Sequence, residues 1–217
     1  IAIQRIHSLL DANSFVEIGA LVRARATDFN TAPVGEASDG VITGYGLIDG
    51  RLVYIYSQNA DVAGGSIGEM HAKKIVKLYS LAIKTGAPVI GLIDSAGLRL
   101  QEGMDALNAF GLIYAQQAKA SGVIPQVSVI YGNCGGGLAL FPAMTDFTFM
   151  ESGAKLFVNS PNAIAGNYED KNNTAAASKK AAAGDVDFVG TEEEIAEQVR
   201  ALIAMLPSNN EDDAAED

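Results

Sequence analysis

The chain has 217 residues, of which 48% are hydrophobic and 19% are charged, so it can bury a core of its own. Its formal net charge of −11 argues against nucleic acid as a main partner. No apolar run reaches the ~20 residues of a membrane-spanning helix. The single cysteine, Cys134, excludes an internal disulfide and a thiolate zinc site and fits a reducing compartment. We therefore expect a cytoplasmic protein with no metal in this chain.

The first half of the chain predicts a helix, a β-hairpin and a second helix. Residues 3–10 have apolar side chains at helical spacing, and the hairpin strands 41–48 and 52–58 flank the strong turn signal Asp49-Gly50. The second helix follows a glycine loop and ends at Gly86. Its expected buried stripe consists of Ile67, Met70, Ile75, Leu78 and Leu81 or Ala82.

The second half repeats the order strand, small-residue loop, helix. A buried strand at 89–94 precedes a helix within 103–122, and a strand within 125–131 leads into the glycine loop that starts at Gly132. Short strands are expected within 146–151 and 154–159. A last helix begins at the N-cap Thr191, with Glu194 as its capping-box partner, and stops at Pro207. This alternation predicts an α/β fold.

Two loops at strand ends carry the chemical signal, "DSAGLRLQEG" from Asp94 and "GNCGGG" from Gly132. A glycine loop that runs into a helix presents free backbone N–H groups, which can bind a phosphate or an oxyanion. Neither loop has a nucleotide-binding glycine spacing, and no G-x-S-x-G nucleophile motif is present. Backbone N–H donors without an evident general base are suited to stabilising an enolate formed on a thioester. The alternative is that the glycines only permit tight packing of the loop.

Several long motifs, in order, resemble the amino-terminal half of the biotin-dependent acyl-CoA carboxyltransferases. They are "SDGVITGYGLIDGRLVYIYSQ", "GGSIGEMHAKKIVKL", "DSAGLRLQEG", "ASGVIPQVSVIYGNCGGGLALFPAMTDFTFM" and the closing "LPSNN". That family includes propionyl-CoA carboxylase β chains, the transcarboxylase large subunit and the carboxyltransferase subunits of sodium-pumping decarboxylases. The resemblance is in register through nearly all of residues 1–210, which we take as the acyl-CoA-binding domain, with 211–217 as an acidic, disordered tail.

The resemblance implies a crotonase-like spiral of ββα units and a reaction that moves CO2 between biotin and the α-carbon of a short acyl-CoA. Biotin would arrive on a partner carrier protein, and a carboxy-terminal half on another polypeptide or subunit would bind it within a homo- or hetero-oligomer. Some relatives have membrane subunits, which leaves attachment through partners open. The backbone amides implied as the catalytic oxyanion donors are those of Gly97, Leu98, Gly136 and Gly137.

The residues expected to contact the CoA ester include cations and small residues of the loops. They are Arg23, Arg25, Gly64, Gly65, Lys73, Ala96, Arg99 and Gly135. Lys74 and Lys77 share the helix of Lys73, and an ordinary solvated helix face is an equal alternative for these lysines. Arg99 is expected mainly to order its own loop, for example through Glu102.

The sequence departs from the family at the proposed oxyanion loops. Ala96 and Leu98 replace smaller residues, and Asn133 and Gly135 stand where relatives often have Pro and Ala. The segment after "FVNSPNAI" is shorter than in relatives, and no second half follows, so we expect a split or shortened subunit that does not complete carboxyl transfer alone. Two alternatives remain: an assembly module whose oxyanion site is blocked, and a biotin-independent crotonase-type enzyme with Glu102 as its carboxylate.

Other residues are given structural roles at this stage. Asp94 and Asp146 are expected to cap strand ends rather than act as bases. His71 is expected at the surface or at an interface. Four aromatic residues that alternate along strands are expected in the core rather than in an adenine-stacking site: Tyr54, Tyr56, Phe147 and Phe149.

Overall fold

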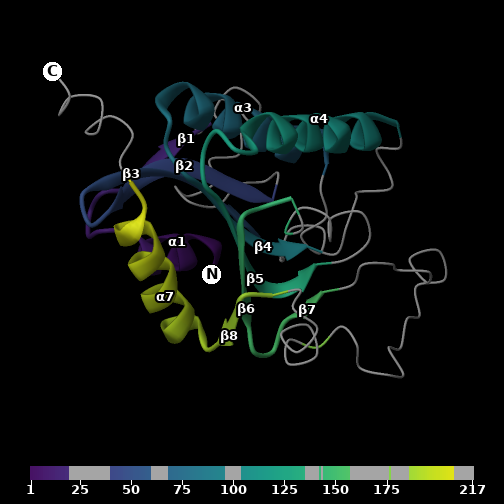
Figure 1. Cartoon of the computed structure of the whole chain (residues 1–217). Helices are drawn as coiled ribbons and strands as arrows, with labels where there is room; N and C mark the ends of the chain where they lie inside the picture. Colours follow the sequence, from purple (N-terminus) through teal and green to yellow (C-terminus); the bar gives the residue numbers. More distant parts are fainter. Residues whose placement is uncertain are drawn as a thin grey trace, which may run out of the picture.

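The structure is a computed structural model that describes residues 1–19, 40–59, 68–95, 104–134, 142, 144–156, 176 and 186–207. Its centre is one eight-stranded sheet. Two helices cover one face of this sheet and two cover the other (Figure 1). Within the described residues, no helix is both long and apolar enough to cross a membrane.

The antiparallel edge of the sheet is formed by β1 (Val16–Ile18), β2 (Val41–Ile48) and β3 (Arg51–Gln58). The hairpin between β2 and β3 confirms the predicted Asp49-Gly50 turn. Both of these residues have positive φ, 48° and 77°, which a two-residue turn of this twist requires. The turn is held from outside, because Asp11 accepts both of its backbone N–H groups, at 3.0 and 2.9 Å.

Parallel strands continue the sheet from β3 through β4 (Val89–Ser95), β5 (Gln126–Cys134), β6 (Phe147–Glu151) and β8 (Phe188–Gly190). The short strand β7 (Lys155–Leu156) pairs with the last two residues of β5. Each parallel pair needs a crossover, and helices supply two of them: α3 (Glu69–Thr85) between β3 and β4, and α4 (Met104–Ala120) between β4 and β5. All of the parallel strands therefore end at the same edge of the sheet.

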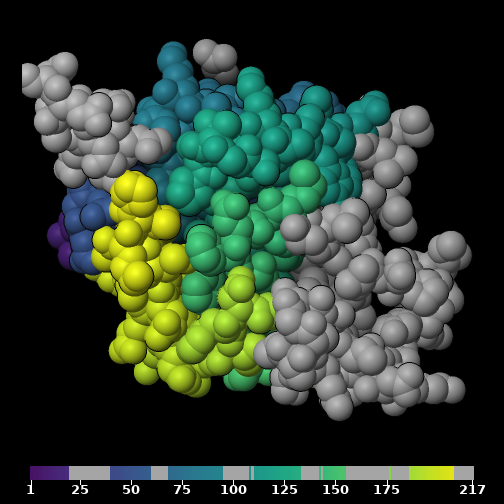
Figure 2. All heavy atoms as spheres, in the orientation of Figure 1, coloured from purple at the N-terminus to yellow at the C-terminus, as the bar shows by residue number. Residues whose placement is uncertain are grey.

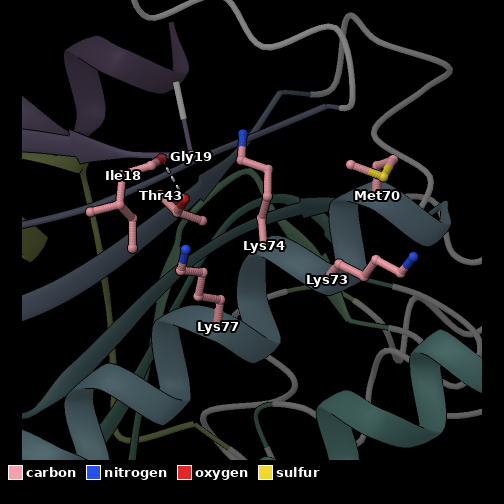
Figure 3. A pocket seen from close by; sticks show the side chains of 7 residues that line it. All are labelled: Ile18, Gly19, Thr43, Met70, Lys73, Lys74 and Lys77. Atoms are coloured by element: carbon pink, nitrogen blue, oxygen red, sulfur yellow. Dashed lines mark hydrogen bonds between the residues drawn. The ribbon is translucent and has the colours of Figure 1, made fainter. Parts of the chain in front are cut away.

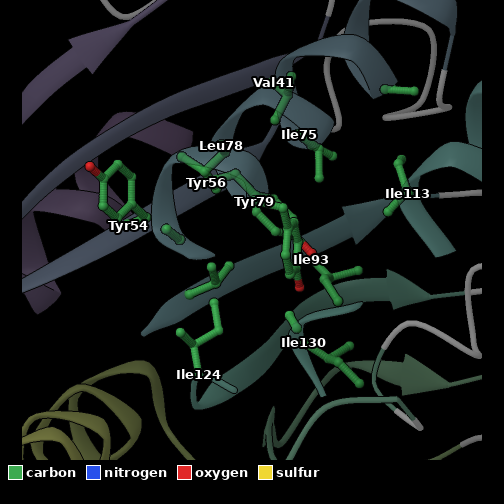
Figure 4. Packing of buried hydrophobic residues seen from close by; sticks show 14 of the residues in the cluster. Val41, Tyr54, Tyr56, Ile75, Leu78, Tyr79, Ile93, Ile113, Ile124 and Ile130 are labelled. Carbon is green, nitrogen blue, oxygen red and sulfur yellow. The ribbon is translucent and has the colours of Figure 1, made fainter. Parts of the chain in front are cut away.

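Helices α3 and α4 pack on one face, where the core includes Tyr56, Ile75, Leu78 and Tyr79 (Figure 4). The opposite face is covered by α1 (Ala2–Leu9) and α7 (Glu192–Met205), over a separate cluster of buried side chains. The space-filling view shows α4 in teal and α7 in yellow at the surface of one side of the molecule (Figure 2).

Most predicted elements are present. The capping box of α7 is confirmed, since the Thr191 hydroxyl accepts the N–H of Glu194 and the Glu194 carboxylate accepts the N–H of Thr191. The core assignment of Tyr54 and Tyr56 is also confirmed, as both are buried. One position of the α3 stripe is wrong: Met70 is 42% exposed, because it lies on the side of α3 that carries Lys73 and Lys77 and not on the side buried through His71 and Ile75.

Candidate functional site

The two chemically suggestive loops leave from neighbouring strands. Strands β4 and β5 are parallel partners, and their last paired residues are Ser95 and Cys134. The segments 96–103 and 135–141 continue directly from these residues. Because the carboxyl ends of parallel strands meet at one edge, the sequence-predicted loops begin side by side, as an oxyanion site built from two loops requires.

Most predicted site residues lie outside the described residues. This applies to the expected amide donors and to nearly all of the expected CoA contacts: Gly97, Leu98, Gly136, Gly137, Arg23, Arg25, Gly64, Gly65, Ala96, Arg99 and Gly135. Glu102 of the alternative mechanism lies outside them as well. Their roles therefore stay predictions, and Lys73 is the predicted site residue that the structure places.

Lys73 lines a hollow of about 170 Å³ beside α3. Lys74 and Lys77 also line it, together with Met70 and a small wall from β1 and β2: Ile18, Gly19 and Thr43 (Figure 3). Successive turns of one helix thus bring three lysine side chains to one hollow, whose walls are mostly apolar, including the aliphatic stems of these lysines. Gly19 keeps the hollow open, since a Cβ there would lie 3.2 Å from Cε of Lys74.

The three lysines are held differently. Lys74 is buried, and its Nζ donates to the carbonyl of Val41 at 2.5 Å. Lys73 is exposed and forms an ion pair with Glu69 at 2.8 Å, one helical turn away. Lys77 is exposed as well. Lys74 is therefore mainly structural, whereas Lys73 and Lys77 line the hollow and have exposed side chains.

The hollow lies at the same edge of the sheet as the two loops. Val41, which accepts from Lys74, pairs with Gln58, the last residue of β3. The Gln58 side chain in turn accepts the backbone N–H of Asp94 at 3.0 Å, at the end of β4. A continuous set of bonds thus connects the lysine hollow to the point where segment 96–103 begins.

Asp94 has a role that sequence reasoning missed. Its Oδ2 lies 3.1 Å from Nη1 of Arg5, a side chain of α1, and both side chains are mostly buried, at 18% and 12% exposure. The guanidinium also lies 4.4 Å from the ring centroid of Tyr131 on β5. The sequence offered no signal for this pairing, because Arg5 and Asp94 are 89 positions apart.

His71 was predicted at the surface or at an interface, and this prediction is wrong, because the side chain is buried within the single chain. Its side chain is fully buried at the start of α3, with Nε2 3.3 Å from Nε2 of Gln58. The helical pattern did place Ile75 and Leu78 on the buried face, and His71 lies one turn before Ile75 on that face. A polar residue on this stripe is accommodated because Gln58 provides a buried partner.

The remaining single-residue predictions are mixed. Asp146 acts as predicted at a strand end, since its Oδ2 accepts the N–H of Gln126 at 2.8 Å where β5 begins. Burial, and secondarily the charge of Glu192, raises the pKa of the Tyr131 phenol well above its usual range, although Arg5 opposes this. Tyr131 is therefore a neutral phenol at physiological pH. The part of the chain that the structure describes contains no group of three potential metal ligands.

Comparison with known proteins identifies the family. The family model described as "Carboxyl transferase domain" matches residues 1–217. The chain belongs to the carboxyl transferase domain family. Its structural neighbours are carboxyltransferases with the crotonase-like fold, which confirms the expected fold class.

Curated relatives are substantially longer than the chain. The α subunit of methylmalonyl-CoA decarboxylase from Veillonella parvula is 44% identical over 97% of this chain, and the match covers 43% of that protein. The propionyl-CoA carboxylase β chain of Roseobacter denitrificans is 42% identical over 95% of this chain and 42% of its own length. The carboxyl transferase domain described here thus spans less than half of each of these relatives.

Solved structures agree. A transcarboxylase 12S structure, a hexamer assembly with methylmalonyl-coenzyme A and methylmalonic acid bound, matches with a TM-score of 0.83 and 35% identity over 95% of this chain and 42% of that chain. A Pseudomonas malonate decarboxylase MdcD–MdcE hetero-dimer matches with a TM-score of 0.77 and 27% identity over 95% of this chain and 87% of that chain. Similar domains therefore occur both within long chains and as a chain of comparable length.

Proposed function

We propose that this carboxyl transferase domain is the acyl-CoA-binding part of a biotin-dependent carboxylase or decarboxylase, which moves CO2 between biotin and the α-carbon of a short acyl-CoA. The observation that carries the proposal is the pairing of Ser95 with Cys134, because it starts segments 96–103 and 135–141 side by side. Family membership and the methylmalonyl-coenzyme A bound to the transcarboxylase neighbour support the same assignment.

The chemistry follows from the α-carbon. Loss of CO2 from this carbon, or loss of its proton before it gains CO2, leaves negative charge that the thioester oxygen takes up as an enolate. In the carboxylation direction, the biotin that has given up CO2 would accept the proton. Backbone N–H groups in a water-poor site stabilise such an oxygen without supplying a competing base, and removal of one such donor typically costs ~3 kcal/mol in the barrier. We assign this role to the amides of Gly97, Leu98, Gly136 and Gly137.

Biotin on a partner carrier protein would supply or accept the carboxyl group, and a carboxy-terminal carboxyltransferase half would complete the site. The malonate decarboxylase neighbour is a hetero-dimer whose matched chain has a comparable length, which supports an arrangement with a separate partner chain. We propose residues 1–210 as the acyl-CoA-binding domain and 211–217 as a disordered acidic tail.

The lysine hollow is the proposed site for CoA phosphate groups. Lys73 and Lys77 line it and have exposed side chains whose ammonium groups can reach an anion beside it, and the hollow lies at the sheet edge where the loops begin. The acidic chain as a whole would repel CoA, so a local gathering of cations at this edge is the feature that would attract its phosphates. Arg23, Arg25, Gly64, Gly65, Ala96, Arg99 and Gly135 are proposed as further CoA contacts.

Calorimetric titration of the chain tests the proposal. Propionyl-CoA, methylmalonyl-CoA and malonyl-CoA should bind saturably, and pantetheine should bind far more weakly because it lacks the nucleotide phosphates. The double variant Lys73→Gln/Lys77→Gln should raise the Kd of the acyl-CoA by about three- to thirtyfold, as the loss of one or two charge-assisted contacts would. The preferred acyl group would define the substrate.

Lys84→Gln is the matched control, because Lys84 is an exposed lysine in the last turn of α3, away from the hollow. It should leave the Kd unchanged. Equal Kd values for all three proteins would place the phosphates elsewhere. Absence of acyl-CoA binding both to the folded chain and to the chain supplied with a carboxy-terminal half would refute the proposed function and favour an assembly module.

A further inference from the structure

We propose that Arg5 and Asp94 are positioning residues that fix the ends of β4 and β5 relative to each other, at the points from which segments 96–103 and 135–141 continue, with Gly132 as the contact through which the Asp94 carboxylate holds both strand ends. The consequence for catalysis rests on the proposed function. The structural part of the proposal stands on the contacts at the ends of β4 and β5.

The pairing of β4 and β5 is irregular at one place, just before the two segments begin. Ile93 pairs with Ile130, and the next pair is Ser95 with Cys134. Strand β4 thus advances by two residues (93 to 95) while β5 advances by four (130 to 134). This bulge lies opposite Asp94 and contains Gly132. Bulges are common beside active sites because they redirect the chain.

The Asp94 carboxylate fills the space that this bulge leaves beside Gly132. A Cβ at position 132 would lie 2.0 Å from Oδ1 and 2.6 Å from Cγ of Asp94. Glycine is therefore required here for space, since no positive φ is involved. The side chain of one strand end rests directly on the backbone of the other, so a shift in Asp94 is transmitted to β5.

Arg5 fixes the carboxylate from the α1 face of the sheet. Alternation along β4 directs Asp94 to the same face as Ile90 and Leu92, where α1 packs, and Arg5 meets it there at 3.1 Å. The same guanidinium stacks over Tyr131, which directly precedes Gly132. Arg5 thus contacts both strand ends at once.

A second set of contacts holds the backbone of Asp94 from the opposite face. Strand β3 ends at Gln58, and the Gln58 side chain extends the ladder by accepting the N–H of Asp94. Gln58 is itself in contact with the buried His71 of α3. Asp94, near the end of β4, is therefore held at its side chain by Arg5 from the α1 layer. Its backbone is held by Gln58, which contacts the α3 layer.

Stability alone does not account for this arrangement. A largely buried ion pair contributes little net stability, because desolvation offsets the attraction. Arg5 Nε and Tyr131 Oη are also buried without a hydrogen-bond partner among the described residues, which costs free energy. What the pair does provide is a fixed geometry one residue before the first segment leaves β4.

The test compares Arg5→Met and Asp94→Asn with a matched control, Arg200→Met, in the assembled enzyme. Arg200 also binds α1, donating to the carbonyl of Leu9 at 2.8 Å and pairing with Asp11 at 2.9 Å, but far from these strand ends in the ladder. Arg5→Met and Asp94→Asn should lower kcat about tenfold or more with little change in KM, since misplaced donors weaken transition-state binding. Arg200→Met should lower the thermal midpoint and leave kcat intact.

Two further variants separate positioning from folding. Arg5→Lys, which keeps the charge, should recover part of kcat. The double variant Arg5→Met/Asp94→Asn should have a kcat no lower than that of either single variant, because each single substitution already removes the same ion pair. A kcat loss that simply follows the thermal midpoint in all variants, Arg200→Met included, would overturn the proposal.

Hydrogen–deuterium exchange of the ligand-free chain makes the test independent of the proposed function. Arg5→Met should accelerate amide exchange in peptides from both 96–103 and 135–141, and Arg200→Met should do so in neither. Faster amide exchange in one segment only, or equally fast exchange in both variants, would contradict the proposed positioning role of Arg5 and Asp94. If the unaltered enzyme neither binds nor turns over an acyl-CoA, the proposed function fails. The exchange result still decides whether Arg5 and Asp94 position the two strand ends.

Discussion

Two arginine–aspartate junctions attach α1 to the sheet, one at each end of the parallel strands. At the end where these strands begin, Arg200 of α7 donates to the Leu9 carbonyl and pairs with Asp11 and Asp49, at 2.8, 2.9 and 3.2 Å. Asp11 also accepts the two N–H groups of the hairpin turn. This junction joins α1, α7 and the β2–β3 turn through well-formed polar contacts.

The Arg5–Asp94 junction at the other end is more deeply buried and leaves polar atoms without hydrogen-bond partners in the part of the chain that the structure describes. Arg5 and Asp94 are more deeply buried than Arg200 and Asp11, and two buried polar atoms near them have no partner among the described residues. A glycine is needed to admit the carboxylate. Unsatisfied polar groups and tight glycine contacts gather at functional sites, because geometry there matters more than free energy. The comparison teaches that similar residue pairs serve folding at one end and the site at the other.

The largest effect is expected from Gly132→Ala, which places a Cβ directly against Asp94 in the Arg5–Asp94 junction. The new Cβ would displace the Asp94 carboxylate, so turnover by the assembled enzyme should fall by about a hundredfold, and the free energy of unfolding should fall by about 1–3 kcal/mol. Steady-state kinetics and urea unfolding measure the two effects.

Gly111→Ala is the matched control for this substitution. Gly111 lies on the exposed side of α4, and its added Cβ would meet no described atom within 4 Å. Alanine in a helix should leave activity unchanged and raise stability by about 0.5–1 kcal/mol. Unchanged turnover in Gly132→Ala would show that Asp94 can move without consequence.

An effect of intermediate size on the free energy of unfolding is expected to distinguish the buried phenols of Tyr79 and Tyr131. Tyr79 Oη donates to Gln126 Oε1 at 3.0 Å, so Tyr79→Phe leaves a buried acceptor unpaired and should cost about 1–3 kcal/mol of unfolding free energy. Tyr131→Phe removes a hydroxyl that has no partner among the described residues and keeps the ring beneath Arg5. It should change stability by less than about 1 kcal/mol in either direction.

Urea unfolding of both phenylalanine variants at pH 7 checks this prediction. A larger loss for Tyr131→Phe than for Tyr79→Phe would show that the Tyr131 hydroxyl has a partner outside the described residues. In that case the Arg5 junction would be better satisfied than the contacts above indicate, and the comparison between the two junctions would weaken.

The smallest effect is expected from Asp11→Asn, at the other junction, and it should depend on pH. The Gly50 N–H, then Arg200 and the Asp49 N–H, hold the pKa of Asp11 below its usual range. A carboxyl with a lowered folded-state pKa stabilises the fold above its unfolded pKa of about 3.9 and loses this contribution as pH falls through the folded value. Asp11→Asn should thus unfold at lower urea concentration than the unaltered chain at pH 7.

The difference between Asp11→Asn and the unaltered chain should shrink when the same urea titrations are repeated toward pH 3. A difference that stays constant or grows at low pH would contradict the assignment. Turnover should be unaffected at pH 7, since this junction lies at the opposite end of the parallel strands from segments 96–103 and 135–141.

The local signals of the sequence were sufficient for most elements. The Asp49-Gly50 turn, the capping box at Thr191 and Glu194, and the strand–loop–helix repeats each depend on residues close in sequence, and the structure contains them. The predicted surface or interface position of His71 was wrong, because residue type was weighed above its place on the buried stripe of α3. Its contact with Gln58 joins separate elements, which no local pattern reports.

The sequence by itself determined the family, the α/β alternation and the two glycine-containing segments, because these reside in runs of neighbouring residues. Only the tertiary structure placed Ser95 beside Cys134, brought Arg5 to Asp94 across 89 positions, and opened a hollow between α3 and the β1–β2 edge beside Lys73 and Lys77. The physical reason is the same in each case. Strand register, the bulge at Gly132 and the packing of a helix on a sheet face are set by contacts between distant segments, whose energies exist only once the chain has folded.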